Sequence, residues 1–162
     1  MEIIDKYHEN YPNTGIIKWI GIRPSKKEKM IELNSACIIE GKGLEGDRSV
    51  YNSEGIRHIT LFQYEYLEVL SKLLNNNNIR LSLLRRNIAI EGINILSLID
   101  KEFYLGTALL AGTGNCHPCS KMEENLGYGG YNAMVGHGGI TAKVITGAII
   151  RIGDFVKLKT IS

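Results

Sequence analysis

The sequence predicts a mainly β protein whose strands curl into a closed or partly closed barrel with a few short helices. Two observations carry this prediction: 18 glycines stand against only three prolines, and short apolar runs rich in β-branched residues recur along the chain. Many glycines lie in these runs or at their ends, which is typical of short strands joined by tight turns and bulges. At 162 residues, without an evident internal repeat, the chain is expected to form one domain.

The N-terminal part of the chain separates a polar arm from the first strands. Residues 1–13 are expected to form a loose arm before a single domain over 14–162. Strands are predicted at 14–22 and 31–40. The charged segment 24–29 between them is interpreted as an exposed, solvated loop.

One long helix is predicted at about 62–75, because apolar residues recur there at helical spacing. Thr60 and Gln63 fit a capping box at its start. The apolar face of this helix is expected to pack into the core.

The second half of the chain is again predicted to be rich in strands. Gly153 and Asp154 fit a tight hairpin turn between the last two of them. The expected strands span residues 103–106, 108–112, 140–144, 149–152 and 155–158.

Composition excludes several classes of protein. A net charge of +2 is too small to indicate a nucleic-acid partner, and no apolar run reaches the length of a membrane span. The N-terminus lacks the pattern of a signal peptide. Three cysteines, an odd number, argue against a disulfide scaffold and favour a reducing compartment. We therefore expect a cytoplasmic protein without a membrane or nucleic-acid partner.

The richest chemistry lies in residues 115–124, which combine two thiols, an imidazole and a helix start. A short helix is predicted at about 118–126, with Pro118 at its first position and Gly127 ending it. Cys119 would then lie in the first turn, where unpaired N–H groups and the positive end of the helix dipole favour a thiolate. A thiolate is the form that attacks, carries sulfur or binds a soft metal.

Other interpretations of this window stay open. Free cysteines are often small buried hydrophobes, and the C-x-x-C spacing of Cys116 and Cys119 also occurs in dithiol redox proteins. A structural zinc site needs four ligands, whereas His117 and these two thiols supply three and Cys37 stands alone.

Three further segments offer anion-binding groups. The glycine-spaced loop 41–48 ends in a charged pair and can present backbone N–H groups. Arg85 and Arg86 are expected to enter a strand and point to opposite faces, so that one must meet an anion or a carboxylate. The glycine-rich segment 127–139 is expected to be an ordered loop that comes close to a ligand, with His137 as a site residue or a turn residue.

In their order and spacing, several short motifs resemble the MOSC domain, the module found at the C-terminus of molybdenum-cofactor sulfurases and as a free-standing bacterial protein. The resemblance covers nearly the whole chain, from about residue 15 to 158. It rests on residues 43–48 (GLEGDR), 58–61 (HITL), 85–88 (RRNI), 112–123 (GTGNCHPCSKME), 131–134 (YNAM), 136–139 (GHGG) and 152–154 (IGD).

The resemblance implies a β-barrel with one essential cysteine, which here matches Cys119. That cysteine would carry sulfur as a persulfide or bind the molybdenum of the pterin cofactor, and the sequence leaves both roles open. Cys116 would be a resolving thiol or a neighbour that tunes it. Arginines and glycine-loop N–H groups would hold the pterin phosphate, and the loop with His137 would close over the pterin. The expected cofactor-binding residues are Asp47, Arg48, Arg85, Arg86, Asn87, Lys121, His137, Gly138 and Gly139.

The resemblance also implies partners. The fused pyridoxal-phosphate desulfurase of the large sulfurases and the N-terminal β-domain of the amidoxime-reducing relatives have no counterpart in this sequence. We therefore expect a separate cysteine desulfurase with a molybdoenzyme acceptor, or finished molybdenum cofactor and an electron-donor reductase. The alternatives are a dithiol redox protein and a non-catalytic cofactor carrier.

Overall fold

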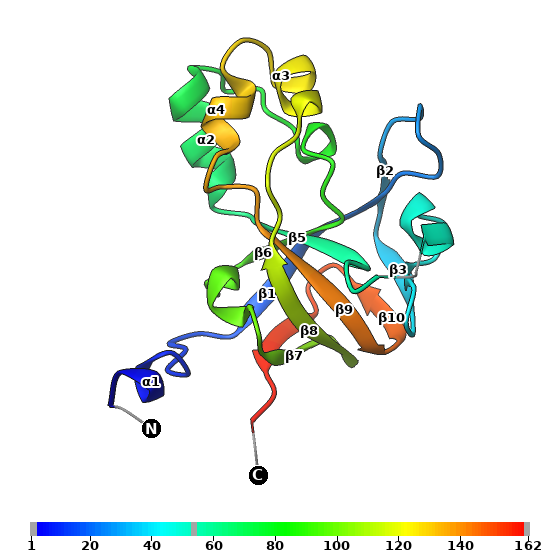
Figure 1. Cartoon of the computed structure of the whole chain (residues 1–162), viewed down its shortest axis with the longest axis vertical. Helices are drawn as coiled ribbons and strands as arrows, with labels where there is room; N and C mark the ends of the chain where they lie inside the picture. The colour runs from blue at the N-terminus through cyan, green and yellow to red at the C-terminus, as the bar shows by residue number, and fades with distance from the viewer. Residues whose placement is uncertain (1–2, 53–54, 161–162) are drawn as a thin grey trace.

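The computed structural model describes residues 3–52 and 55–160, and the predictions for residues 1–2, 53–54 and 161–162 lie outside them. Within these residues, seven strands close into a barrel, which confirms the predicted fold class. All neighbouring strands in the barrel are antiparallel except β5 and β6 (Figure 1). In spatial order the barrel strands are β11 (Phe155–Leu158), β7 (Glu102–Leu105), β8 (Ala108–Asn115), β9 (Ile140–Thr146), β5 (Ile59–Gln63), β6 (Ile88–Glu91) and β1 (Gly15–Ile22), which pairs with β11.

The remaining strands lie outside the closed ring. β2 (Ile31–Leu33) extends the sheet beyond β1, whereas β3 (Ser35–Ile39) pairs with β4 (Gly43–Leu44) and β10 (Ala148–Arg151) in a separate sheet. The predicted strand over 31–40 is therefore two strands, since the chain passes from one sheet to the other near Asn34.

The helices gather at one end of the barrel. Figure 1 shows α2 (Tyr66–Leu74), α3 (Ser120–Leu126) and α4 (Gly130–Met134) grouped above the ring. Short 3-10 turns are η1 (Arg48–Asn52), η2 (Leu81–Leu83) and η3 (Ile95–Leu98). None of the helices within the described residues has the length and apolarity that crossing a membrane would require.

Two hydrophobic clusters stabilise this arrangement. The larger one fills the barrel, with fully buried residues such as Ile17 of β1 and Phe103 of β7. The smaller one lies beneath the helices, where Phe62 of β5 meets Leu70 of α2 and Met122 of α3. The helical cap is thus fixed to the barrel end by its own core, and this junction carries the cysteine segment.

Both predicted helices begin later than expected. α2 starts at Tyr66, because residues up to Gln63 form β5, so the expected capping box does not form. The Thr60 hydroxyl bonds to Asn87 instead. α3 starts at Ser120, and Pro118 lies before it rather than at its first position.

The chain ends also differ from expectation. The turn at Gly153 and Asp154 joins β10 to β11, but these strands belong to different sheets and do not form a hairpin. The arm predicted over 1–13 contains α1 (Ile3–Tyr7), which buries none of its residues. Tyr11 then packs on the barrel core and donates a hydrogen bond to the Ser97 carbonyl, so the arm is fastened at its base.

Candidate functional site

The thiol of Cys119 lies at the start of the helical cap and is exposed to solvent. Cys119 is the residue before α3, with an extended backbone (φ −121°, ψ 172°), and its carbonyl accepts the N–H of Met122 at 2.9 Å. Gly127 ends the helix with φ 88°, as predicted. The helix therefore begins one residue after the sulfur, and the thiol makes no capping hydrogen bond.

Arg85 faces this thiol across the site. Its Nη1 lies 3.5 Å from Cys119 Sγ, so the guanidinium offers a cationic donor to an anionic sulfur. Its backbone is left-handed (φ 57°), which is uncommon for a residue with a side chain and often marks functional sites. Its Nε is buried without a hydrogen-bond partner among the described residues, so this N–H has no acceptor within that part of the protein.

Arg86 lies in the opposite environment, with only 6% of its surface exposed. Its Nε donates to the Gly138 carbonyl at 2.7 Å, and its Nη1 donates to the Leu84 carbonyl at 3.1 Å. Its Nη2 lies within 3.5 Å of the carbonyls of Cys116 and His117. Its donors are thus occupied by backbone carbonyls and it ties three segments together, while its role in holding the cofactor stays a prediction.

Cys116 and the two glycines 138 and 139 form one tightly packed contact. The N–H of Cys116 donates to the Gly139 carbonyl at 2.9 Å. A Cβ on Gly138 would lie 2.0 Å from the Cys116 carbonyl oxygen, and one on Gly139 would lie 1.9 Å from the Leu61 carbonyl oxygen. These glycines were expected to contact a cofactor, but their lack of a side chain is explained by close packing of backbone against backbone.

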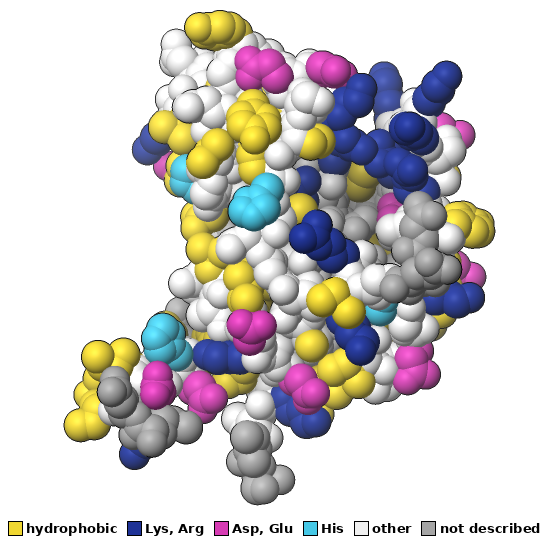
Figure 2. All heavy atoms as spheres, viewed as in Figure 1, with side chains coloured by type: hydrophobic (Ala, Val, Ile, Leu, Met, Phe, Trp, Pro, Cys, Tyr) yellow, Lys and Arg dark blue, Asp and Glu magenta, His cyan; other side chains and the backbone are white. Residues whose placement is uncertain are grey.

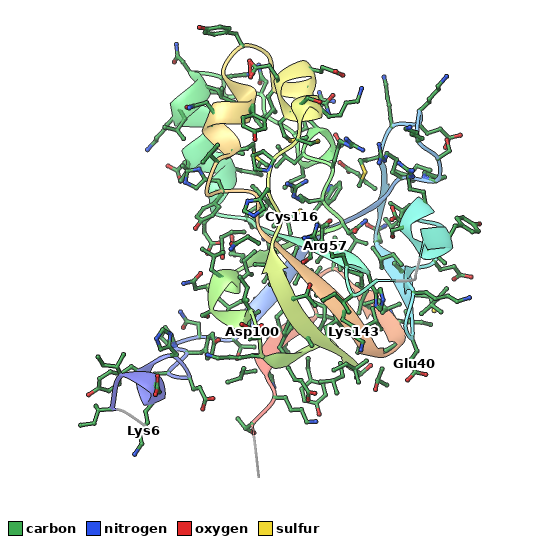
Figure 3. All side chains as sticks on the ribbon, viewed as in Figure 1. Lys6, Glu40, Arg57, Asp100, Cys116 and Lys143 are labelled. Atoms are coloured by element: carbon green, nitrogen blue, oxygen red, sulfur yellow. The ribbon has the colours of Figure 1, made fainter. Side chains whose placement is uncertain are left out.

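The thiol of Cys116 is half-buried, unlike that of Cys119. Burial raises its pKa, and the nearby charges of Arg86 and Arg57 only partly oppose this effect. Figure 3 labels Cys116 and Arg57 at the end of the barrel below the helical cap. Because a raised pKa lowers the thiolate fraction at neutral pH, Cys116 is the less suited of the pair to act as nucleophile.

Arg85 also lines a hollow of about 260 Å³ at the barrel end, which we call the small hollow. The hollow is rich in cations and contains a single carboxylate, Asp47. It is lined by Arg23, Met30, Asp47, Arg48, Ser49, Arg57, Thr60, Arg85 and Asn87.

Asp47 and Asn87 shape this hollow rather than leave free groups in it. The Asp47 carboxylate is buried and accepts hydrogen bonds from the Arg23 backbone N–H and from the backbone and hydroxyl of Ser49. Asn87 bonds to Thr60 of β5 and to the Gly21 carbonyl of β1. Both side chains therefore position the strand ends that present the arginines.

Arg23 and Arg57 were not predicted, although both line the small hollow. Arg23 follows β1 directly, and Arg85 lies just before β6, which pairs with β1 in antiparallel register. The end of one strand therefore meets the start of the other, and the two arginines converge. The only signal in the sequence was an arginine at the end of a strand. That signal does not indicate a site until the pairing of β1 with β6 is known.

His137 and Lys121 are not brought into the small hollow. The Nδ1 of His137 bonds to the Ala133 carbonyl at 2.9 Å, and its ring packs edge-on against Tyr66. Lys121 forms an ion pair with Glu124 at 2.9 Å. The predicted loop 127–139 contains α4, so this segment is a short helix flanked by turns.

The charge of the surface follows from this geometry. Figure 2 shows Lys and Arg side chains gathered over the loop before β2 and the adjacent part of the helical cap.

Among residues 3–52 and 55–160, no group of three or more His, Cys, Asp or Glu could hold a metal ion. Cys116, His117 and Cys119 therefore do not form a three-ligand metal site among these residues.

Comparison with known proteins gives a family and a fold. The family model of the MOSC domain matches residues 50–157, a range that contains Arg85 and both cysteines of the window. A comparison with curated proteins found no match.

Solved structures share the fold at low sequence identity. The YUAD protein from Bacillus subtilis has a TM-score of 0.77 at 17% identity, over 93% of this chain and 98% of that one. YiiM from Escherichia coli has a TM-score of 0.67 at 16% identity, over 93% and 72% of the two chains. YiiM from Geobacillus stearothermophilus has a TM-score of 0.69 at 15% identity, over 90% and 75%.

Proposed function

The chain belongs to the MOSC domain family, which is associated with binding of the molybdenum cofactor, and from this premise we propose that it binds that cofactor with Cys119 as the reacting or ligating thiol. The observation that carries the proposal is the contact between Arg85 and Cys119. It joins an exposed sulfur to a hollow lined by several arginines, and no other described cysteine has such surroundings.

The small hollow suits the phosphate of a pterin cofactor. Arginine recognises phosphate through paired N–H donors, and Arg48, Arg57 and Arg85 line the same space. The buried Nε of Arg85 is a donor that still needs an acceptor. The hollow of about 260 Å³ would hold the phosphate, and Arg85 links it to Cys119.

The protein residues have distinct tasks in this proposal. When bound, the cofactor supplies a redox-active metal that accepts sulfur ligands. Cys119 supplies the sulfur, either as a direct ligand or as the carrier of a transferable sulfur atom. Arg85 would hold two anionic groups, the phosphate of the cofactor and the thiolate of Cys119. Arg86 fixes the segments on which Arg85 and the cysteines lie.

The dithiol alternative is less well supported by the geometry. A C-x-x-C pair normally uses a readily ionised, accessible first cysteine. Here Cys116 is half-buried with a raised pKa, while Cys119 is exposed. The two residues are therefore arranged for one reactive thiol rather than two.

The proposal includes partners and a compartment. Sulfur transfer needs a separate cysteine desulfurase and a molybdoenzyme acceptor, whereas a reductase role needs an electron donor. Three free thiols suit the reducing cytoplasm.

The test is native mass spectrometry of the protein purified without oxygen from cells that make molybdenum cofactor. We expect the mass of bound cofactor in the natural protein and its loss in Cys119→Ser. Cys37→Ser is the matched control, because Cys37 lies on β3, outside the site, and is expected to retain the cofactor.

Each other result has a defined meaning. One extra sulfur atom on Cys119 identifies the sulfur-carrier form of the proposal. Cofactor retained without turnover identifies a carrier. Equal retention by Cys119→Ser contradicts the ligand role of this thiol, and if Cys119 also carries no extra sulfur atom in the natural protein, it contradicts the proposal for Cys119 altogether. A Cys116–Cys119 disulfide without cofactor would replace the proposal with the dithiol redox function.

A further inference from the structure

A second and larger hollow lies beside the small one, and its lining is strongly basic. Its volume is about 590 Å³, and it is bounded by the loop 23–30, by η2 with its flanking residues, and by α3. We call it the basic basin. It is lined by Arg23, Lys26, Lys27, Glu28, Lys29, Met30, Arg80, Ser82, Leu83, Arg85, Lys121, Glu124 and Asn125.

The charges in the basic basin are not balanced within the protein. Seven of its lining residues are cationic and two are acidic, although the whole chain has a net charge of only +2. One of the acidic residues, Glu124, is paired with Lys121. None of the other six cations forms an ion pair with another described residue. The excess positive charge is therefore concentrated in one place and open to a ligand.

Cations lie close together where the two hollows meet, and their repulsion affects the pKa of Arg23. The pKa of Arg23 is lowered, first by partial burial and then by the charges of Arg85 and Arg48. An anion placed among these groups would relieve this repulsion. The Asp47 carboxylate only partly offsets this repulsion, so the fold holds like charges together without balancing them fully.

The basic basin is linked to the reactive thiol through Arg85. This residue lines both hollows, and its Nη1 contacts Cys119 Sγ. The helix that follows Cys119 supplies Lys121 and Asn125 to the basin wall. A molecule bound in the basin would therefore lie beside Arg85, the residue that contacts the thiol.

We propose that the basic basin is a second anion subsite, which binds a small molecule with two or more carboxylate or phosphate groups beside Cys119. The inference rests on the proposed function in taking Cys119 as the reacting centre. It adds the class of small molecule that this site would take.

The size of the basin favours a small molecule over a flat partner surface. Its volume is within the range of small-molecule sites, roughly 300–1,000 Å³. Its cations come from three separate segments and surround one space, rather than following a single face. The lysine-rich part lies in residues 23–30, outside the matched family range of 50–157.

The test compares two disulfide reagents on the full-length protein prepared without the cofactor. Cys119 attacks a reagent disulfide, forms a mixed disulfide and releases a coloured thiol compound. Dithiobis(nitrobenzoate) is dianionic and dithiodipyridine is neutral. Because both react with the same thiol, the ratio of their rates reports the effect of reagent charge, and any change in the reactivity of the thiol itself cancels. Cys119→Ser provides the background from the other cysteines.

The basin variant combines Lys26→Gln, Lys27→Gln and Lys29→Gln. Its matched control combines Lys6→Gln, Lys42→Gln and Lys143→Gln, three exposed lysines outside the basin that make the same change in net charge. Figure 3 labels Lys6 and Lys143, which lie far from the basin end of the molecule.

We expect the dianionic-to-neutral rate ratio to fall about five-fold in the basin variant and to change little in the control, with the difference shrinking in high salt. Millimolar citrate or pyrophosphate should slow the dianionic reagent in the natural protein but not in the basin variant. The more effective of the two identifies carboxylate or phosphate as the preferred group.

An equal fall in both variants, or in neither, would overturn the proposal, because the basin would then have no special effect. The proposal would also be overturned if neither citrate nor pyrophosphate slowed the dianionic reagent. The positive charges of the basin would then attract anions without binding them at a site. Failure of the proposed function is seen separately, as absence of bound cofactor in the mass spectrum, and leaves this rate ratio unaffected.

Discussion

Arg85 and Arg86 are neighbours in the sequence, but their side chains face opposite parts of the molecule. Arg86 is buried and donates to backbone carbonyls from three segments. Arg85, with a left-handed backbone, turns its guanidinium to the surface and contacts the thiol of Cys119. One arginine therefore builds the site and the other is available to a ligand, and the backbone turn between them makes the difference.

The two cysteines of the window repeat this division. Cys116 is half-buried and held through its backbone by Arg86 and Gly139. Cys119 is exposed and faces Arg85. An inner pair, Arg86 and Cys116, thus supports an outer pair, Arg85 and Cys119. The comparison predicts that substitutions in the inner pair change stability, whereas those in the outer pair change chemistry.

The largest expected difference is between Arg86→Met and Arg85→Met. Loss of the buried guanidinium leaves several carbonyls without donors, which should lower the free energy of unfolding by about 3 kcal/mol. Arg85→Met should lower it by less than about 1 kcal/mol, because a side chain at the surface is replaced. Urea denaturation of both variants measures the difference, and equal losses would contradict the division into inner and outer residues.

The sequence predicted the barrel because its signal is local: short β-branched runs and glycines recur along the chain. It also placed Cys119 and Arg85 in one site, through the resemblance of their motifs to a known family. It did not predict Arg23, since the approach of Arg23 to Arg85 depends on the pairing of β1 with β6. It assigned Arg86 and Gly138 to a ligand, because backbone carbonyl partners from distant segments leave no mark in the sequence.

Strand pairing also explains the errors in the secondary structure. The segment before α2 is apolar enough to extend a helix, but pairing with β6 and β9 draws Ile59–Gln63 into the barrel. The last turn has the residues of a hairpin, yet β10 pairs with β3 and β11 pairs with β7. In both places a long-range contact overrides a local preference.

The next effect tests the packing that holds Cys116. Gly138→Ala would place a Cβ 2.0 Å from the Cys116 carbonyl oxygen and 3.2 Å from Nη2 of Arg86, so the inner pair must shift. We expect a loss of about 2 kcal/mol in the free energy of unfolding. The matched control is Gly136→Ala, which meets nothing within 4 Å and carries only the strain of its positive φ of 78°, about 1 kcal/mol.

Thermal or urea denaturation distinguishes the two glycine variants. A greater loss for Gly136→Ala than for Gly138→Ala would show that backbone strain outweighs the contact with Cys116. The predicted order would instead confirm that close packing, rather than a ligand, accounts for the glycine at 138.

The smallest expected effect is the pH dependence of stability that comes from Cys116. Burial raises the pKa of this thiol above its ordinary value of 9.0 in the folded protein. The unfolded chain therefore loses its proton at lower pH than the folded chain, and the free energy of unfolding falls as pH rises through the ordinary value. Below that value both states keep the proton, and Cys116 adds no pH dependence.

Denaturation from neutral pH to about pH 10 should thus show a steeper loss of stability in the natural protein than in Cys116→Ala. The substitution itself lowers stability at every pH, so only the difference in slope is compared. Cys37 and Cys119 are present in both proteins, and their contributions cancel. Parallel curves would mean that the Cys116 thiol titrates alike in both states, and the division between an inner, protonated thiol and an outer, reactive one would then lose its electrostatic basis.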